Sequence, residues 1–369
     1  MRVVCQDCGS VEVLTPSQWR CTCGGPWEPR KEEGCERDLI DTASTSVWRY
    51  RRLFSPDLGE PTVRLGAGWT PLLEAQWGDR RILLKLEYLM PTGSFKDRGT
   101  EVMINLLAAQ GVTAIVDDSS GNAGASVAAY AARAGMRAQV FVPGYASPSK
   151  QQQIAAYGAR VSPVPGPRDN ARREAEQAAE SGWTPAFHSY HPGFLLGQSS
   201  VAWEVWEQLG FRTPDWYVVP VGQGVHLLGV WMGFRRLHSA GLIPRMPRLV
   251  AVQARAVSPL CEALERGGED WPDPGASQRS VAEGVAIQRP VRWRRLLQVM
   301  RESGGFSVSV GEREILEAQE RGAHCGFYVE PTSATVLAAL DQIFLRAGAS
   351  DHIVVPLTGS GLKGSPAPL

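Results

Sequence analysis

Short apolar runs alternate with small-residue or amphipathic segments along the chain from Thr70 onward. The apolar runs predict buried strands, at residues 81–86, 113–116, 137–142, 216–221, 248–253 and 351–356. Intervening segments predict helices that end at a glycine, at residues 100–110, 123–134 and 147–157. Strands and helices that alternate at this spacing are typical of a parallel sheet with helices on both faces. We therefore expect an α/β fold.

The composition of the 369-residue chain is that of a globular protein with two or three domains. Its 38 Lys and Arg residues balance 38 Asp and Glu residues, so the formal net charge is 0 and we expect no nucleic acid or membrane partner. We find no apolar run long enough for a spanning helix and no secretory signal. We therefore expect a cytoplasmic location, where the seven cysteines are metal ligands or core residues.

Residues 1–35 differ from the rest of the chain because they hold five of the seven cysteines. Cys5 and Cys8 form one close pair, and Cys21 and Cys23 form a second, each followed by glycine. Two such pairs can offer four thiolates to one tetrahedral zinc ion, and glycine lets the backbone turn tightly around it. The second pair has one intervening residue where the commoner arrangement has two, so a metal-free ribbon remains the alternative to structural zinc.

Lys96 lies in the strongest candidate segment, PTGSFKDRG at residues 91–99. Turn-forming residues precede this lysine and a predicted helix follows it. A lysine at such a junction can project into a cleft, where desolvation lowers the pKa of its ammonium group and frees the amine as a nucleophile. Considered alone, Lys96 is better explained as a solvated surface charge, because most lysines are.

Two glycine-containing segments directly follow predicted strands. Residues 119–124, SSGNAG, place backbone N–H groups at a helix start, where a carboxylate or an electron-rich oxygen binds in open α/β sheets. A purely structural turn is the alternative for this segment. Residues 220–226, PVGQGVH, form a turn that can hold a phosphate. This turn matches neither the dinucleotide fingerprint nor the Walker loop, because it lacks the third glycine of the first and the lysine of the second.

A nucleophilic lysine, an oxygen-binding helix start and a phosphate cup together suit pyridoxal phosphate. The three segments resemble the lysine motif, asparagine loop and phosphate loop of threonine synthase and its relatives among the fold-type II (tryptophan synthase beta-like) pyridoxal-phosphate enzymes. Residues 330–334 (EPTSA) and 357–363 (LTGSGLK) resemble two later motifs of the same family. The resemblance spans residues 62–363, and five ordered motifs make it specific for fold and cofactor.

The resemblance implies two doubly wound parallel-sheet α/β domains behind a small N-terminal cysteine-rich ribbon. We assign residues 1–35 to a zinc-ribbon-like segment and 36–68 to a connecting segment. Residues 69–200 contain the smaller α/β domain with the lysine and asparagine motifs, and 201–369 form the larger α/β domain with the phosphate loop. The larger domain also takes in part of residues 36–100. The resemblance further implies a homodimer.

Each motif residue takes a role from the resemblance. Lys96 would hold the cofactor as a Schiff base and, once substrate releases it, move protons. Thr358 would face the pyridine nitrogen, and a hydroxyl there favours elimination and replacement over transamination. The implied cofactor-binding residues are Lys96, Phe95, Asn122, Gly222, Gln223, Gly224, Val225, His226 and Thr358. The residues implied to bind the substrate carboxylate are Ser119, Ser120, Gly121 and Ala123.

Several positions depart from the threonine synthase pattern. Ala123 follows the loop asparagine where these enzymes usually have threonine, and Phe194 replaces an arginine that grips the phosphate of phosphohomoserine. A phenyl ring cannot replace a guanidinium fork, so we expect another substrate unless Arg98 or Lys150 compensates. Residues 280–286, SVAEGVA, instead resemble dehydratases, and their Glu283 is placed either near the cofactor ring or in solvent. The charged, alanine-rich stretch 168–180 is interpreted as a solvated helix without a further role.

The sequence therefore predicts a pyridoxal-phosphate-dependent carbon–oxygen lyase or synthase, threonine synthase-like, that acts on a small amino acid by β- or γ-elimination or replacement. A threonine or serine dehydratase-like enzyme and a β-replacement enzyme similar to cysteine or cysteate synthase are the alternatives. A non-catalytic protein that binds pyridoxal phosphate is a further alternative, against which the intact Lys96, Asn122 and Thr358 argue.

Overall fold

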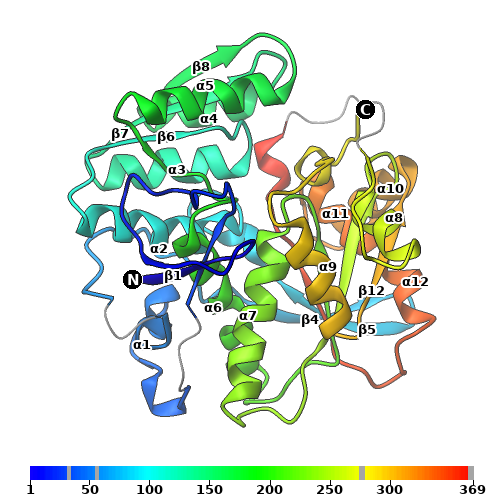
Figure 1. Cartoon of the computed structure of the whole chain (residues 1–369). Coiled ribbons are helices and arrows are strands. Elements are labelled where there is room, and N and C mark those ends of the chain that lie inside the picture. Colours follow the sequence, from blue (N-terminus) through cyan, green and yellow to red (C-terminus); the bar gives the residue numbers. More distant parts are fainter. Residues whose placement is uncertain (31–34, 55–57, 274–278, 365–369) are drawn as a thin grey trace.

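The computed structural model describes residues 1–30, 35–54, 58–273 and 279–364. Figure 1 shows two separate sheets with helices packed around each and the N-terminal ribbon in front of them. No helix in these described ranges is long and apolar enough to cross a bilayer.

The larger sheet has six strands in the order β12-β11-β10-β13-β5-β4. Its strands are β4 (Leu72–Trp77), β5 (Arg80–Lys85), β10 (Trp216–Pro220), β11 (Arg248–Ala254), β12 (Phe306–Val310) and β13 (Ile353–Pro356). All neighbours are parallel except β4, which pairs antiparallel with β5 at the edge. Alternate residues of β10 face two different apolar cores, Tyr217 on one side and Val218 on the other, so this central strand is buried on both faces.

The smaller sheet has four strands in the order β8-β7-β6-β9, and all are parallel. Its strands are β6 (Ala114–Asp117), β7 (Arg137–Pro143), β8 (Arg160–Val164) and β9 (Thr184–Pro185). All of them lie within the predicted 69–200 segment, whereas β4 and β5 of that segment join the larger sheet. The proposed boundary at residue 200 stays a prediction.

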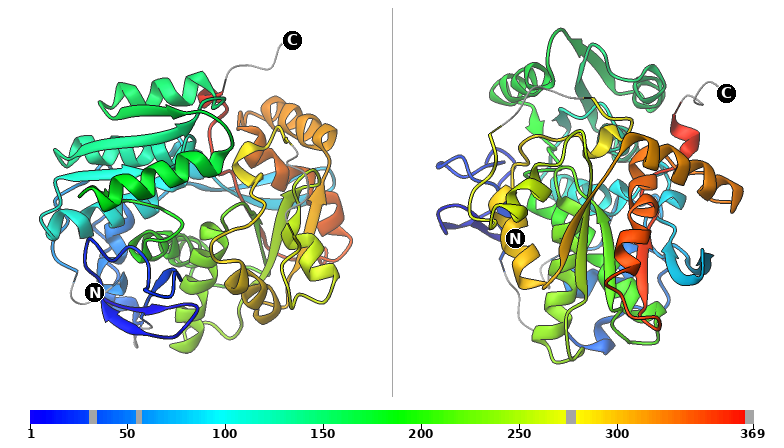
Figure 2. Two further views of the ribbon diagram at one scale, coloured as in Figure 1. Left: turned by 45° about the horizontal axis from the view of Figure 1, so that its top comes forward. Right: turned by 90° about the vertical axis from the view of Figure 1, so that its right-hand side faces the viewer.

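Helices cover both faces of the sheets (Figure 2). They are α1 (Arg51–Phe54), α2 (Lys96–Ala109), α3 (Asn122–Arg133), α4 (Pro148–Ala156), α5 (Arg168–Glu180), α6 (Pro192–Gln208), α7 (Val225–Ser239), α8 (Pro259–Glu265), α9 (Trp293–Glu302), α10 (Glu312–His324), α11 (Pro331–Ala338) and α12 (Leu340–Phe344). Helix α6 packs against both α2 and α7, which places a nearly all-buried helix in the middle of the molecule. Short 3-10 turns include η3 (Glu87–Leu89) and η4 (Glu283–Val285).

A buried ionic cluster joins the larger sheet to the helices beside it. Arg98 on α2 donates to Glu87 at 2.7 Å and to Glu204 of α6 at 2.7 Å, and Lys85 at the end of β5 also pairs with Glu204. All four side chains are fully buried. Because two positive and two negative groups occupy one site with paired hydrogen bonds, the cost of burying each charge is offset.

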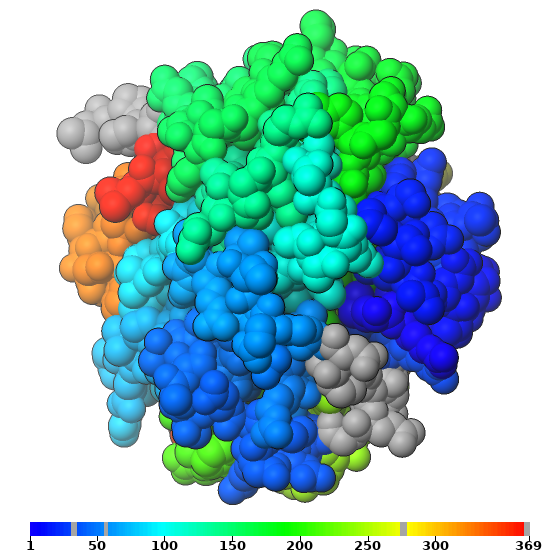
Figure 3. Space-filling model, turned by 90° about the vertical axis from the view of Figure 1, so that its left-hand side faces the viewer, coloured from blue at the N-terminus to red at the C-terminus, as the bar shows by residue number. Residues whose placement is uncertain are grey.

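The cysteine-rich ribbon is a three-stranded antiparallel sheet in the order β2-β1-β3, with β1 (Arg2–Cys5), β2 (Val11–Val13) and β3 (Trp27–Pro29). Figure 3 shows it in dark blue as a lobe at the edge of one face of the molecule. The connecting segment follows with η1 (Arg37–Leu39), η2 (Val47–Tyr50) and α1, whose side chains Trp48, Tyr50 and Phe54 are buried in the main core.

The predicted strands and helices are confirmed, with ends that shift by a few residues. The largest shift is at α2, which begins at Lys96 and not at residue 100. The first turn of α2 is charged, and Asp97 and Arg98 are buried by specific polar partners that an apolar pattern does not reveal. Strand β12 and the antiparallel edge strand β4 were not predicted.

Candidate active site

A pocket opens where the carboxyl ends of β6 and β10 face each other. It is lined by Phe95, Lys96, Ser119, Ser120, Gly121, Asn122, Ala123, Lys150, Arg168, His188, Pro220, Gly222, Gln223, Gly224, Val225, His226, Glu283, Gly284, Val285, Ile287, Glu330 and Thr332. The pocket thus brings together every residue predicted to bind cofactor or substrate except Thr358. Ligands bind at this edge of open parallel sheets because helix N-termini converge there.

Lys96 enters this pocket at the first residue of α2. Its Nζ lies 4.8 Å from the ring centre of Phe95 and 5.7 Å from that of Phe194. Within the described residues it forms no ion pair. Burial, together with the nearby guanidinium of Arg168, lowers the pKa of Lys96 to about 7. At neutral pH a large share of the amine is therefore uncharged and nucleophilic.

Asn122 begins α3 directly beside the substrate-side loop. Its Nδ2 donates to Oε1 of Glu330 at 2.7 Å, while its buried Oδ1 has no hydrogen-bond partner. The loop turns sharply here, and only glycine fits at position 124. A Cβ on Gly124 would lie 1.9 Å from the carbonyl oxygen of Ser119. The first N–H groups of a helix lack intrahelical partners. The helix α3 begins among the lining residues Ser119–Ala123, so these N–H groups are available to a ligand there.

The turn after β10 begins α7 in the same way. Gly224 precedes the helix with φ +76°, a left-handed conformation that favours glycine, and a Cβ on Gly222 would lie 2.3 Å from the carbonyl oxygen of Gly284. The backbone of this turn is therefore close to its neighbours, and Val225 and His226, the first residues of α7, line the pocket. A helix start of this kind suits an anion. The side chain of Gln223 makes a structural contact: its Oε1 accepts from the backbone N–H of Val291 at 3.2 Å.

Three histidines near the pocket are held neutral by burial. Desolvation lowers the pKa of His226 to about 4 and that of His191 to about 3, and it lowers the pKa of His188 well below the usual range. His226 packs edge-on to Phe95 at 4.8 Å between ring centres, and its buried Nε2 has no partner. His191 caps α6 by accepting from the N–H of Gly193 at 3.1 Å. His188 and His226 line the pocket, whereas His191 caps α6, and neutral imidazoles cannot serve as positive charges there.

Thr358 lies behind the lining residues and is fully buried. Its hydroxyl and that of Ser333 share a hydrogen bond of 2.9 Å, and its carbonyl oxygen accepts from the N–H of Phe95 at 2.9 Å. Thr358 therefore holds the segment that carries Lys96. Its predicted contact with a pyridine nitrogen stays a prediction.

The positively charged side chains that line the pocket are not all those that the sequence led us to expect. Arg98 faces the buried ionic cluster and not the pocket, so it does not replace the charge missing at Phe194. Phe194 is fully buried against Gly99. Lys150 lines the pocket and pairs with Glu283 at 3.1 Å. Arg168, the first residue of α5, also lines it, which corrects the interpretation of 168–180 as a helix without a further role.

Glu330 is a site residue to which the sequence motifs assigned no role. It lines the pocket, binds Asn122 and raises the pKa of Lys96 slightly against the larger lowering effects. Its position directly before Pro331 at the start of α11 was the available signal, because a polar residue at that junction faces the same crevice. Glu283 also lines the pocket, although its side chain is 64% exposed and paired with Lys150, so it lies at the pocket mouth.

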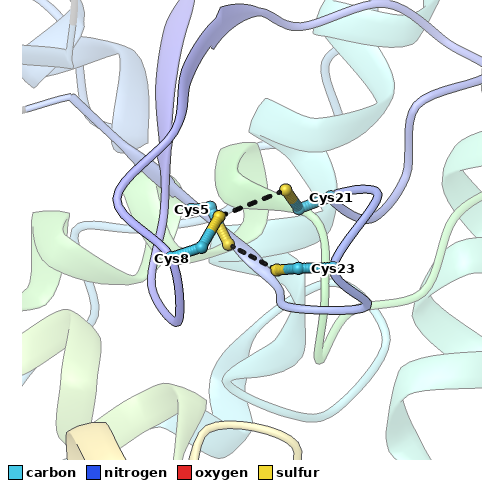
Figure 4. A group of neighbouring side chains, drawn as sticks. All are labelled: Cys5, Cys8, Cys21 and Cys23. Carbon is cyan, nitrogen blue, oxygen red and sulfur yellow. Dashed lines mark hydrogen bonds between the residues drawn. The ribbon is translucent and has the colours of Figure 1, made fainter.

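The four ribbon cysteines converge on one another (Figure 4), and none of them is among the residues that line the pocket. The sulfur atoms of Cys5, Cys8, Cys21 and Cys23 all lie within 4.8 Å of one another. Sγ of Cys5 lies 3.5 Å from that of Cys23, and Sγ of Cys8 lies 3.6 Å from that of Cys21, so no disulfide joins them. Hydrogen bonds from Ser10 lower the pKa of Cys8 to about 6, which makes one thiolate available at neutral pH.

Comparisons with known proteins agree with this geometry. A family model described as "Pyridoxal-phosphate dependent enzyme" matches residues 63–359. Threonine synthase of Methanocaldococcus jannaschii is 33% identical over 97% of this chain and 92% of its own, and that of a Synechocystis species is 36% identical over 89% and 83%. The crystal structure of a threonine deaminase from T.th. has a TM-score of 0.69 at 28% identity and covers 80% of this chain and 94% of that one.

The residues present fit pyridoxal phosphate. The desolvated amine of Lys96 suits its aldehyde, and the glycine turn at the start of α7 suits its phosphate. The buried Oδ1 of Asn122 and Nε2 of His226 are polar atoms without partners in the same pocket, as expected where a polar ligand completes the hydrogen bonding. The chain therefore belongs to the fold-type II pyridoxal-phosphate-dependent enzymes, among their threonine synthase-like members.

Proposed function

We propose that this protein catalyses β- or γ-elimination or replacement on a small amino acid, with pyridoxal phosphate held at Lys96. One observation carries the proposal: the amine of Lys96, whose pKa burial lowers to about 7, lines a pocket between two helix N-termini. Lysines with such a lowered pKa and an adjacent anion site are suited to bind an aldehyde cofactor.

When bound, pyridoxal phosphate supplies an aldehyde for the substrate amine and a conjugated ring that accepts electrons as the Cα–H bond breaks. The chain's own residues do the rest. The amine of Lys96, once displaced by substrate, would accept the Cα proton, and a pKa of about 7 would let it hold and return that proton at neutral pH. Phe95 and Phe194 keep water from its Nζ.

Two helix starts orient the reactants. The N-terminal N–H groups of α7, after Gly224, bind the cofactor phosphate, and those of α3, with Ser119 and Ser120, bind the substrate carboxylate. The resemblance implies that the hydroxyl of Thr358, which shares a hydrogen bond with Ser333, would face the pyridine nitrogen, where a carboxylate would keep that nitrogen protonated. This arrangement supports elimination and replacement over transamination.

The leaving group separates two candidate activities. A phosphorylated substrate, as the resemblance to threonine synthases implies, is favoured by Arg168 and Lys150 in the pocket. A hydroxyl or acetyl leaving group, as in a dehydratase or a β-replacement enzyme, is favoured by Phe194, which brings no charge, and by Glu283, which neutralises Lys150. O-phosphohomoserine, O-phosphoserine, O-acetylserine, threonine and serine should each be tested for phosphate release and keto-acid formation.

Cofactor attachment is tested by reduction. Borohydride treatment of the reconstituted protein should fix one pyridoxyl group, and peptide mass spectrometry should place it on Lys96. Lys96→Ala should lose both the label and the visible absorbance of the bound cofactor. Lys150→Ala is the matched control, because Lys150 is the other lysine that lines the pocket, and it should keep both. A label on Lys150, or none on the wild type, contradicts the proposal.

We also propose that the four ribbon cysteines bind one zinc ion. Tetrahedral zinc with Zn–S bonds of about 2.3 Å requires sulfur atoms about 3.8 Å apart, close to the 3.5 and 3.6 Å seen here. Metal analysis should find about one zinc per chain, and Cys21→Ser should lose it, while Cys325→Ser, which alters an exposed thiol elsewhere, should not. A wild-type protein purified with added zinc but without bound metal would refute this site.

A further inference from the structure

Arg292 is a fully buried cation that contacts both the ribbon and the wall of the active-site pocket. Its guanidinium donates to the carbonyl oxygens of Ser189 at 2.9 Å, Tyr190 at 2.8 Å and Trp27 at 2.7 Å, and more distantly to the side chain of Gln6 at 3.4 Å. Within the described part of the chain Arg292 forms no ion pair. Three backbone carbonyl oxygens accept from its guanidinium, and Trp27 of the ribbon supplies one of them. The nearby carboxylates of Glu28 and Asp7, also on the ribbon, favour the charged form.

On the ribbon side, the contacts of Arg292 are next to the four-cysteine cluster. Gln6 follows Cys5 directly, and Trp27 pairs with Cys5 between β1 and β3. The backbone N–H of Gln6 also donates to Pro26 at 3.1 Å. The positions of both Arg292 partners therefore depend on how the loops that carry the cysteines are held.

On the active-site side, Ser189 and Tyr190 directly follow His188, which lines the pocket. The ring of Trp19 on the ribbon adds edge-on contacts to Phe187 at 5.1 Å and Tyr190 at 4.8 Å between ring centres. The residue before Arg292 makes a second link, because the N–H of Val291 donates to Oε1 of Gln223 in the phosphate loop.

We propose that the ribbon is a metal-dependent clamp, in which zinc on the four cysteines fixes Trp27 and Gln6 and thereby, through Arg292, the His188 wall and the phosphate loop. Arg292 is a positioning residue in this scheme, since it contacts neither cofactor nor substrate. Loss of the metal releases the ribbon carbonyl, leaves the buried guanidinium short of an acceptor and loosens both walls. The proposal rests on the zinc site and the cofactor proposed above.

The test compares metal-loaded and chelator-stripped protein, each as wild type and as Arg292→Gln, with pyridoxal phosphate affinity as the readout. Stripping should raise the dissociation constant of the wild type about tenfold, and Arg292→Gln should do the same with metal present. Stripping the metal from Arg292→Gln should then raise its dissociation constant by less than about a further twofold. The substitution and the stripping interrupt the same link, so their effects do not multiply. Arg294→Gln, an exposed arginine on α9, is the control and should respond to stripping as the wild type does. Effects that multiply, or no effect of stripping, would overturn the clamp.

Hydrogen exchange separates the clamp from the proposed chemistry. Stripping the metal should speed amide exchange at residues 187–191 and 221–226 in the wild-type protein with or without cofactor. If the protein binds no pyridoxal phosphate, the proposed function fails, and this exchange still decides the clamp. If Arg292→Gln does not fold, Arg292→Lys replaces it, because it keeps the charge and loses the fork that reaches both sides. Unchanged exchange in both segments contradicts the proposal.

Discussion

Asn122 and Glu330 are joined by a hydrogen bond of 2.7 Å, although 208 residues separate them in the sequence. Asn122 begins α3 beside the smaller sheet, and Glu330 precedes α11 beside the larger sheet, so this bond spans the pocket between the two. It fixes the direction of the Asn122 amide and leaves its second N–H free of this bond, which is the group that we expect to donate to a cofactor oxygen.

We expect Asn122→Ala to weaken pyridoxal phosphate binding by about tenfold to a hundredfold, because it removes both the amide donor and the link across the pocket. Glu330→Gln should weaken it less than tenfold, since a glutamine can still accept from Asn122. Equilibrium titration followed by visible absorbance measures both. Equal losses in the two variants would show that the carboxylate charge, and not the orientation of Asn122, matters.

The lowered pKa of Lys96 predicts a distinctive pH dependence of cofactor attachment to the apoenzyme. With a pKa of about 7, the reactive neutral amine increases between about pH 6 and pH 8 and is complete above that. The rate of attachment, followed by stopped-flow absorbance, should rise about tenfold over this interval and then level off. N-acetyl-lysine, with the ordinary value near 10.5, is the control and should keep rising to about pH 10.

The lowered pKa of Lys96 also makes the stability of the apoenzyme depend on pH. The folded apoenzyme releases the Lys96 proton near pH 7, whereas the unfolded chain keeps it up to about pH 10.5. The unfolded state therefore binds more protons in that window, and this group makes the free energy of unfolding rise with pH there. Comparing the wild type with Lys96→Met across the window isolates the effect, and a difference that does not change with pH would contradict it.

Arg168 should determine how well the enzyme accepts phosphorylated amino acids. We expect Arg168→Gln to lower kcat/KM for O-phosphohomoserine and O-phosphoserine by at least about tenfold, because charge-assisted hydrogen bonds to phosphate contribute roughly 1.5–3 kcal/mol. The value for serine should change by less than about twofold. Arg173→Gln, an exposed residue on the same helix, is the control. A uniform loss for all substrates would assign Arg168 a structural role only.

The buried ionic cluster should be a major source of stability. Glu204→Gln leaves Lys85 and Arg98 with excess positive charge in a site without solvent, so we expect a loss of about 3–5 kcal/mol in the free energy of unfolding. Glu74→Gln, which breaks the exposed pair with Arg81, should cost less than about 1 kcal/mol. Denaturant titrations of both variants measure the contrast, and similar small losses would show that the cluster is replaceable.

Much of the fold and the pocket lining could be predicted because local signals encode them. Apolar runs located β5, β6, β7, β10, β11 and β13, and closing glycines located α2, α3 and α4. Three motif segments located the pocket residues at 95–96, 119–123 and 222–226. The role of Arg168 could not be predicted in this way. A charged residue at the start of a solvent-facing helix looks the same in sequence whether it faces bulk water or a pocket, and only the packing of α5 distinguishes the two.

Long-range polar contacts were the other part that sequence could not provide. Arg98 seemed available for a substrate, yet Glu87 and Glu204, the latter 106 residues away, occupy its guanidinium. Arg292 likewise carries no local signal of its contact with Trp27, 265 residues earlier. Such pairs depend on the final arrangement of distant elements, which periodicity does not report.

The order of strands in the two sheets also determines which parts of the chain can fold during translation. Strand β5 must wait for β13, whose Val354 pairs with Leu83, before the middle of the larger sheet can close. The smaller sheet, in contrast, is complete once Pro185 has left the ribosome. A nascent chain can therefore assemble the smaller sheet while β5, paired only with β4, still exposes the edge that β13 later covers, and that edge needs protection from wrong pairing in the interval.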